Sequence, residues 1–278
     1  MSPYKSDKIL YGSPNKTFPI EDVKEAVENL EIILGLNRKP VGVKLIFSKE
    51  EYDKLKEEEI KGKTSYCVMI EKATREFSFK SRYENHNCDG GTTALALEPS
   101  TERIESGEEY FSYNLYSTNA TAHRMRKSIK SLHRCEFSTY GLLTKPLDKF
   151  DIVPDVVIII ANPYQVMRLT QGYVYHLGIK PELDYGAMQA ICSESTVVPY
   201  LTGSMNISTL CPSTRMLAKW KDEEMAAGIP YEKFLSTVEG VIATINTTDM
   251  KKKKEDIISK FKEKGKNIDL TLDNDYEV

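Results

Sequence analysis

The longest unbroken apolar run in this chain extends from Val156 to Ala161 and consists mainly of β-branched residues. A run of this length and kind is typical of a strand that is buried on both faces of a sheet. Asn162 and Pro163 follow directly, and this pair favours entry into a helix, which we expect near residues 164–177. The first expectation is therefore a sheet covered by helices.

Helical and strand patterns alternate along the rest of the chain. Helical spacing predicts helices at 21–35 and 119–133, and alternation predicts strands at 41–47, 77–81 and 135–139. Ser48 and Glu51 form a capping box for a helix to about residue 58, and Ser65 can cap a short helix. We also expect a helix start at 92–97, helical or mixed segments at 214–227 and 231–246, and a Lys-rich helix at 250–264. Interleaving of this kind favours an α/β fold, with a single domain and a mixed sheet flanked by helices whose topology stays open.

Composition narrows the function classes. The 38 Lys and Arg residues against 41 Asp and Glu give a net charge of −3, so a charge suited to coating nucleic acid is absent. No apolar run can cross a bilayer, and residues 1–19 lack the apolar core of a secretory signal. We expect a cytoplasmic protein, with neither membrane nor nucleic acid as its partner.

No repeat, long linker or shift in composition divides the chain. We expect an N-terminal arm at 1–19, a single α/β domain at 20–247, and a Lys-rich helix with an acidic tail at 248–278. The basic stretch from His123 to Arg134 contains no acidic residue and could receive a phosphate, an acidic protein or nucleic acid. A solvated helix face is the preferred interpretation there and at Lys251–Lys254, because aromatic interleaving is absent.

Five cysteines in a chain without an export signal argue against a disulfide framework and leave free thiols, metal ligands or a nucleophile. Cys67, Cys88 and Cys211 each stand near the expected start of a helix. Helix N-termini lower the pKa of a thiol, so these positions suit thiolates that bind a metal or attack an electrophile. Cys192 lies in a loop-rich segment together with Cys211.

Four thiolates are what a [4Fe–4S] cluster or a structural zinc site requires. Cys67, Cys88, Cys192 and Cys211 supply them, while Cys135 falls in an expected strand. Zinc is less favoured, because zinc ligands usually come in closely spaced pairs and none occurs here. The alternative is that these cysteines only pack as small buried hydrophobes.

Five further residues could bind a cofactor beside the thiols. His86 could be an alternative ligand or a proton donor, although a lone His in a polar turn is commonly just solvated. Asp89, Gly90 and Gly91 would expose amide donors and allow close approach of a ligand, although an ordinary turn also explains them. Arg215 could hold an anionic substrate or a cluster, although it could equally be a surface residue.

Several common motifs are absent. The chain has no P-loop, no Rossmann glycine fingerprint, no Gly-x-Ser-x-Gly elbow and no His-Glu-x-x-His. The commonest nucleotide-binding and hydrolase explanations are thereby removed.

Several segments together resemble an uncharacterised archaeal and bacterial family, the domain of unknown function 169 family. They are Arg38–Lys44, Cys67, Cys88–Gly91, Pro154–Ile158 leading to Asn162-Pro163, Cys192–Arg215 and Gly228–Pro230. The resemblance spans about residues 20–245 and implies a prokaryotic origin, mainly in anaerobes. It also implies recurrent cysteines at Cys67, Cys88, Cys192 and Cys211, but no activity. Pro212-Ser213-Thr214 stands where the family leads us to expect a glycine-containing step.

The leading hypothesis is a soluble cluster-binding protein with a redox or cofactor-related role in anaerobic metabolism and the four cysteines as ligands. Its partners would be a redox protein or a small anionic ligand, and it could be a homo-oligomer. A second hypothesis is a metal-free enzyme in which Cys88, beside His86 and Gly90-Gly91, attacks a small acyl or thioester substrate. A third is a ligand-binding or oligomeric scaffold. Whether the protein is an enzyme stays open.

Overall fold

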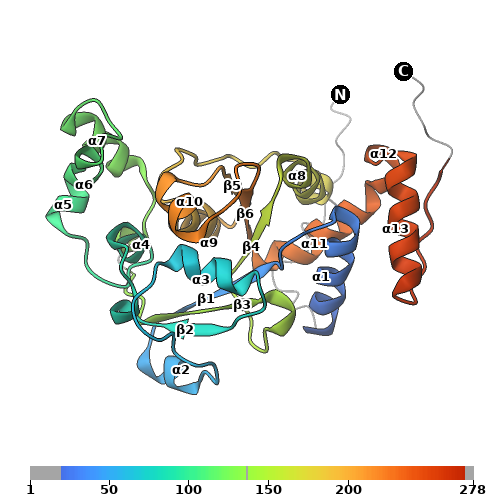
Figure 1. Cartoon of the computed structure of the whole chain (residues 1–278), viewed down its shortest axis with the longest axis horizontal. Coiled ribbons are helices and arrows are strands. Elements are labelled where there is room, and N and C mark those ends of the chain that lie inside the picture. The colour runs from blue at the N-terminus through green and yellow to red at the C-terminus, as the bar shows by residue number, and fades with distance from the viewer. Residues whose placement is uncertain (1–19, 136, 273–278) are drawn as a thin grey trace, which may run out of the picture.

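The computed structural model describes residues 20–135 and 137–272 and contains one six-stranded sheet (Figure 1). The strand order is β2-β3-β1-β4-β6-β5. The strands are β1 (Val41–Ile46), β2 (Phe79–Ser81), β3 (Gly141–Pro146), β4 (Val156–Ala161), β5 (Asn206–Ser208) and β6 (Met225–Pro230). An α/β fold with one sheet flanked by helices is confirmed.

Thirteen α-helices lie in the described part of the chain. They are α1 (Ile20–Leu34), α2 (Lys49–Lys54), α3 (Tyr66–Ala73), α4 (Asp89–Ala94), α5 (Glu102–Glu105), α6 (Glu108–Ser112), α7 (Asn119–Ser128), α8 (Pro163–Leu177), α9 (Val198–Thr202), α10 (Pro212–Ala218), α11 (Tyr231–Ala243), α12 (Ile245–Thr248) and α13 (Lys251–Glu263). A π-helix (Ala190–Val197) leads directly into α9. None of the helices described is long and apolar enough to cross a membrane.

The sheet differs from the expected one in strand direction. Every pair between its named strands is antiparallel, so the expectation of a mixed sheet was wrong. The apolar run of β4 indicates that the strand is buried on both faces, and helices cover both faces here. Burial alone does not determine whether the neighbouring strands run parallel or antiparallel to β4. β4 pairs with β1 on one side and with β6 on the other.

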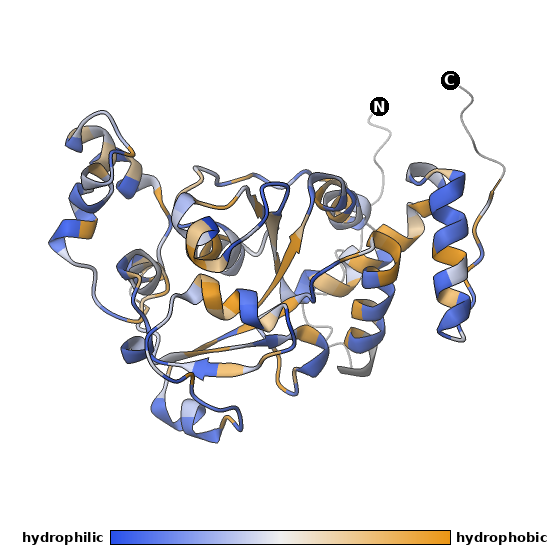
Figure 2. Cartoon of the chain, in the orientation of Figure 1, coloured by the Kyte–Doolittle hydropathy of each residue, from blue (hydrophilic) through white to orange (hydrophobic). Residues whose placement is uncertain are grey.

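Two apolar clusters lie on the two faces of the sheet. On one face, α1, α8, α11 and α13 pack against Val157 and Ile159 of β4. On the other face, α3 and the π-helix pack against Val156, Ile158 and Ile160 of the same strand. Figure 2 shows the apolar residues concentrated on β4 and α11 and the polar residues on the outer surface of α13. All four cysteines proposed as ligands lie on the α3 side.

Local signals explain several helix starts. The Ser48 side chain accepts a hydrogen bond from the Glu51 amide, and the Ser65 side chain accepts one from Val68, as N-caps do. Asn162 and Gln165 form a capping box at the start of α8, where Pro163 occupies the first helical position. These predicted starts are confirmed.

The expected strand at 135–139 was wrong. Leu132–Cys135 forms a 3₁₀ turn, and the amides of Phe137 and Thr139 donate to the carbonyls of Leu132 and Ala96 instead of to a neighbouring strand. The strand of this region begins later, at Gly141. Similarly, residues 214–227 divide between α10 and β6, and the helix that begins at Lys49 ends at Lys54, short of residue 58.

Helices α5, α6 and α7 form a lobe at one end of the molecule, far from α12 and α13 (Figure 1). We call residues 102–128 the helical lobe. Much of the basic stretch of α7 and the turn after it is paired internally: Arg126, Lys127 and Arg134 all form salt bridges with Glu105. Lys130 pairs with Asp184. The stretch therefore holds the lobe together instead of presenting a fully solvated face.

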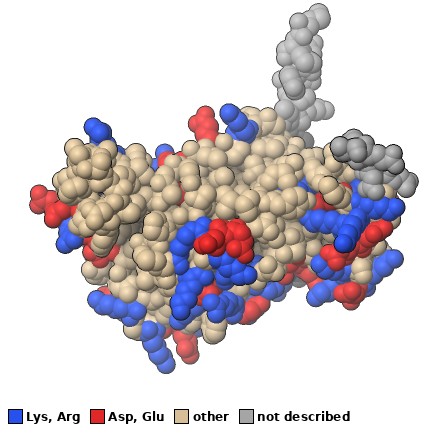
Figure 3. Space-filling model, turned by 45° about the horizontal axis from the view of Figure 1, so that its top comes forward, with Lys and Arg blue, Asp and Glu red and all other residues tan. Residues whose placement is uncertain are grey.

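The Lys-rich helix α13 packs on the core through Ile257 and Phe261. Its charges are balanced by acidic neighbours, for example in the Lys260–Asp256 salt bridge. Figure 3 shows blue and red side chains intermingled at this end of the molecule. The expected N-terminal arm at 1–19 and residues 273–278 of the expected acidic tail lie outside the described residues.

Candidate functional site

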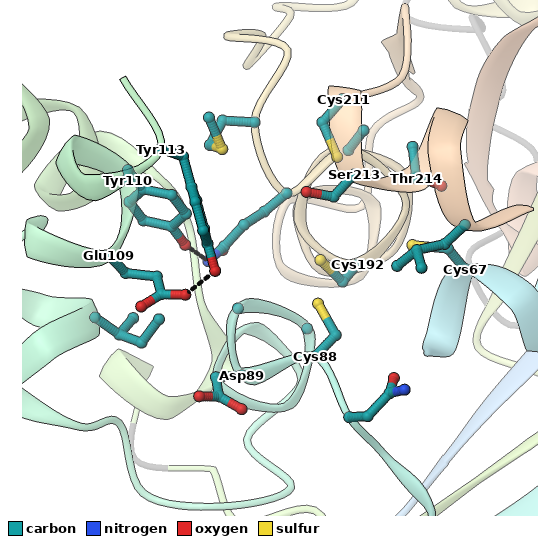
Figure 4. A pocket seen from close by; sticks show the side chains of 18 residues that line it. Cys67, Cys88, Asp89, Glu109, Tyr110, Tyr113, Cys192, Cys211, Ser213 and Thr214 are labelled. Carbon is teal, nitrogen blue, oxygen red and sulfur yellow. Dashed lines mark hydrogen bonds between the residues drawn. The ribbon is translucent and has the colours of Figure 1, made fainter. Parts of the chain in front are cut away.

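Four of the five cysteines line one pocket of about 340 Å³ on the α3 side of the sheet. They are Cys67, Cys88, Cys192 and Cys211. Figure 4 shows their sulfur atoms turned towards one another from four separate segments of the chain. The fifth, Cys135, is exposed and is not part of the pocket lining.

Cys67 lies in the first turn of α3, and the helix cap places it there. Ser65 caps the helix, and the apolar face of α3 packs Tyr66 and Ile70 into the core. Cys67 is only 8% exposed. Its orientation is therefore fixed by the same packing that holds the helix on the sheet.

Cys88 is the residue that precedes α4, and its carbonyl accepts hydrogen bonds from the amides of Gly91 and Thr92. The glycines here permit close packing of the pocket wall. A Cβ at Gly90 would stand 3.1 Å from the Gln189 side-chain nitrogen, and one at Gly91 would stand 3.6 Å from the Cys88 sulfur. The Gly90-Gly91 step thus places backbone in the pocket wall.

Cys192 lies in the π-helix, a structure that is rare and is frequently found at functional sites. Gln189, the residue before this helix, has a left-handed backbone with φ 53°, and its carbonyl accepts from the amides of Ser193 and Glu194. Glu194 is buried, and its carboxylate accepts from the Gly186 amide at 2.8 Å. These bonds anchor the loop that leads to Cys192.

Cys211 precedes α10, in which Pro212 takes the first helical position. Leu210 before it has a left-handed backbone with φ 70°, a conformation that costs a non-glycine residue about 1–2 kcal/mol. Strained backbone of this kind tends to cluster at functional sites. Pro212-Ser213-Thr214 forms the first turn of α10 without glycine, and the residue with the left-handed backbone, Leu210, stands two positions before Pro212.

Burial raises the pKa of Cys67 and Cys192 well above the ordinary range of a thiol, and the neighbouring cysteines raise it further. Burial also raises the pKa of Cys88, although the amides of Gly91 and Gly90 oppose the change. The expectation that a helix N-terminus lowers the thiol pKa was therefore wrong for Cys67 and Cys88. The cost of desolvating a buried thiolate exceeds the stabilisation that the N-termini of these short helices provide.

The electrostatics of the pocket favour a positively charged occupant. The described residues that line the pocket include no Lys, Arg or His, but they include the acidic residues Asp89 and Glu109. No side-chain cation is therefore available there for the small anionic ligand that the sequence suggested. Within residues 20–135 and 137–272, no group of three or more Cys, His, Asp or Glu side chains is arranged to hold a metal ion.

Two of the residues expected around the cofactor lie elsewhere. His86 is buried next to the pocket segment but pairs with Ser81 at 3.0 Å, and burial lowers its pKa to about 4. Arg215 donates to the backbone carbonyls of Thr209, Lys221 and Glu224, so its role is to hold the chain around α10. Neither is among the residues that line the pocket.

The wall of the pocket opposite the cysteines was not indicated by the sequence. It comprises Ile104, Glu109, Tyr110, Tyr113, Met188 and Gln189, which come from the helical lobe and the loop before the π-helix. Figure 4 shows Tyr110 and Tyr113 side by side, facing the cysteines across the pocket. Only long-range folding brings these residues to the site, so no local pattern could have identified them.

The comparisons with known proteins agree with the resemblance found in the sequence. The protein called "Uncharacterized protein MJ0308" of Methanocaldococcus jannaschii is 27% identical over 228 residues, which are 80% of this chain and 94% of that protein. No solved structure matches the chain. The model of the family DUF169, described as "Uncharacterised ArCR", matches residues 29–240, about three quarters of the sequence. The chain therefore belongs to the domain of unknown function 169 family.

Proposed function

We propose that this protein binds a [4Fe–4S] cluster through Cys67, Cys88, Cys192 and Cys211 and has a redox or cofactor-related role. One observation carries the proposal: these four thiols, which come from four separate segments, line one pocket, while the fifth cysteine lies outside it. Four cysteine thiolates are the usual ligand set of such a cluster.

The absence of a single-ion arrangement among the described residues is compatible with this ligand set. In a [4Fe–4S] cluster each iron takes one thiolate, so the four sulfurs surround a core and do not meet at one atom. A structural zinc, by contrast, requires four donors around one ion. Four thiols that line one pocket are compatible with the ligand set of a cluster.

The raised pKa values describe the thiols as they are without a bound metal. Buried thiols that raise one another's pKa stay protonated unless a positive centre stabilises the thiolates. Coordinated metal supplies that charge, and a coordinating thiol is deprotonated outright. In this role the four side chains hold the cluster, and the apolar residues around them limit access of solvent.

The same observations oppose a metal-free Cys88 nucleophile. A catalytic cysteine needs a lowered pKa or an adjacent base, and burial raises the pKa of Cys88. His86 is bonded to Ser81. The described pocket lining contains neither His nor Lys that could accept the thiol proton.

The test is anaerobic purification, followed by iron, sulfide and zinc analysis and a visible spectrum of the same sample. The wild-type chain is expected to be brown, with near-stoichiometric iron and sulfide. Cys67→Ser, Cys88→Ser, Cys192→Ser and Cys211→Ser should each lose most of both. Cys135→Ser is the matched control and should keep the full content, because Cys135 is exposed and outside the pocket.

A colourless wild-type protein after reconstitution, or zinc without sulfide, would overturn the proposal. Full iron and sulfide in all four pocket variants would overturn it as well. Circular dichroism of each variant identifies any loss of cluster that arises from misfolding.

A further inference from the structure

The pocket has two chemically different sides. The thiol side consists of the four cysteines. The tyrosine side consists of Tyr110 and Tyr113 from the helical lobe, together with Gln189, Glu109 and Asp89. The proposed cluster uses only the thiol side, so the tyrosine side needs its own explanation (Figure 4).

Gln189 carries an unused hydrogen-bond acceptor at this site. Its side-chain nitrogen donates to the Tyr110 hydroxyl, while its side-chain oxygen is buried and has no partner in the described structure. The residue is only 5% exposed. Leaving a buried acceptor unpaired costs about 1–3 kcal/mol, which a bound donor would recover.

The backbone adds a second cost at the same residue. Gln189 has a left-handed φ of 53°, and so does Ala187 two residues earlier. Non-glycine residues rarely adopt this conformation, and strain of this kind tends to occur where it serves function. Gln189 therefore combines a strained backbone with an unpaired side-chain oxygen at a position in the pocket wall.

The charges at the tyrosine side favour a cation. Glu109 accepts from the Tyr113 hydroxyl and forms a salt bridge with Arg103 at 2.5 Å, so its charge is partly compensated. Asp89 is exposed at the pocket and takes part in no salt bridge within the described chain. Faces of tyrosine rings attract cations as well.

We propose that the tyrosine side binds a small organic ammonium ion. Its N–H groups donate to the free oxygen of Gln189, its charge is balanced by Asp89, and its alkyl part lies against the tyrosine rings. Its role as a substrate beside a cluster rests on the function proposed above. Binding of the ammonium ion itself depends only on the tyrosine side.

Ligand-observed NMR titration of the anaerobically purified protein tests this proposal, with ethylammonium as the probe. Ethylammonium is expected to bind saturably, and acetate is expected not to bind. Tetramethylammonium, which carries the charge without an N–H donor, should bind at least about fivefold more weakly, the equivalent of one hydrogen bond.

Variants of Gln189 locate the binding. Gln189→Leu should weaken ethylammonium binding about tenfold, because a hydrogen bond to a charged group is lost. Gln189→Glu keeps the volume, adds a negative charge and should tighten binding, which keeps the test decisive if the leucine variant misfolds. Tyr175→Phe is the control and should bind as the wild type does, since Tyr175 is exposed and outside the pocket lining.

Iron and sulfide analysis of the same samples separates the two proposals. A loaded cluster without saturable ethylammonium binding overturns the ammonium site and leaves the proposed cluster standing. Ethylammonium binding to a protein that takes up no iron or sulfide supports the ammonium site and overturns the cluster. Equal affinity in the wild type and both Gln189 variants also overturns the ammonium site.

Discussion

Gly228 of β6 lies directly against the backbone of Ser195 in the π-helix: a Cβ at residue 228 would stand 2.2 Å from the Ser195 carbonyl oxygen. Real side chains do not approach backbone so closely, so glycine is required for the π-helix to rest on the sheet. Cys192 belongs to the same π-helix. The contact therefore sets the depth at which this thiol enters the pocket.

Gly228→Ala should lower the free energy of unfolding by about 3 kcal/mol, because the new methyl group must displace backbone. Urea denaturation measures the change. Gly62→Ala is the control: a Cβ there meets nothing within 4 Å, and only the left-handed backbone opposes it, at a cost of about 1 kcal/mol. Equal losses in the two variants would show that the contact with Ser195 is unimportant.

Thiol labelling of metal-free protein should separate Cys135 from the pocket cysteines. Cys135 is exposed and should react first with iodoacetamide at pH 7. Burial raises the pKa of Cys67, Cys88 and Cys192, so their thiolate fractions are small at that pH and their labelling should accelerate only at higher pH. Mass spectrometry of digested protein follows each site. Faster labelling of Cys88 than of Cys135 at pH 7 would instead favour a nucleophilic role.

Glu105 should stabilise the helical lobe in a pH-dependent way. Burial alone would raise its pKa, but the hydrogen bond from Ser100 and the charges of Arg126 and Arg134 lower it to about 2. A lowered folded-state pKa gives stability that is present above pH 4.5 and is lost as the pH falls towards 2. After allowance for solvent screening, we expect a contribution of about 1–2 kcal/mol.

Glu105→Gln should remove that contribution at pH 7 and flatten the decline between pH 4.5 and 2, as measured by thermal unfolding. Glu102→Gln, on the same helix but exposed, is the control and should behave as the wild type. Identical pH profiles for the wild type and Glu105→Gln would contradict the expected role of Glu105.

A buried ion pair joins α8 to the C-terminal helices. Arg168 and Asp249 approach to 3.0 Å, and both side chains are fully buried. Asp249→Asn should lower the free energy of unfolding by about 3 kcal/mol, since it leaves a buried arginine without its counter-charge. Asp256→Asn removes the exposed pair with Lys260 and should lower the free energy of unfolding by only about 0.5 kcal/mol. Equal losses in the free energy of unfolding for Asp249→Asn and Asp256→Asn, measured by chemical denaturation, would show that the buried pair is no more important than the exposed one.

Local physics made parts of the fold predictable. Ser48, Ser65 and Asn162 start helices because their side chains satisfy amides of the first turn within a few residues. The apolar run from Val156 to Ala161 identified the central strand because it is covered on both faces. By contrast, the direction of its neighbours depends on how distant segments pair, and no local pattern records that pairing.

The candidate site shows the same division. The number of cysteines, the lack of close pairs and the exclusion of common motifs follow from the sequence alone. The sequence also singled out Cys67, Cys88, Cys192 and Cys211, in part through the family resemblance. It could not bring them together, because the four come from segments that meet only after the sheet and the π-helix have packed.

The sequence by itself determined the α/β class, the main helix starts and the central strand, and it singled out the four cysteines that line the pocket. Each depends on periodicity or on groups a few positions apart. Only the tertiary structure decided that His86 and Arg215 turn away, that Tyr110 and Gln189 complete the pocket, and that burial raises the pKa of Cys67, Cys88 and Cys192. Those outcomes depend on desolvation and long-range contacts, which arise when distant parts of the chain exclude water together.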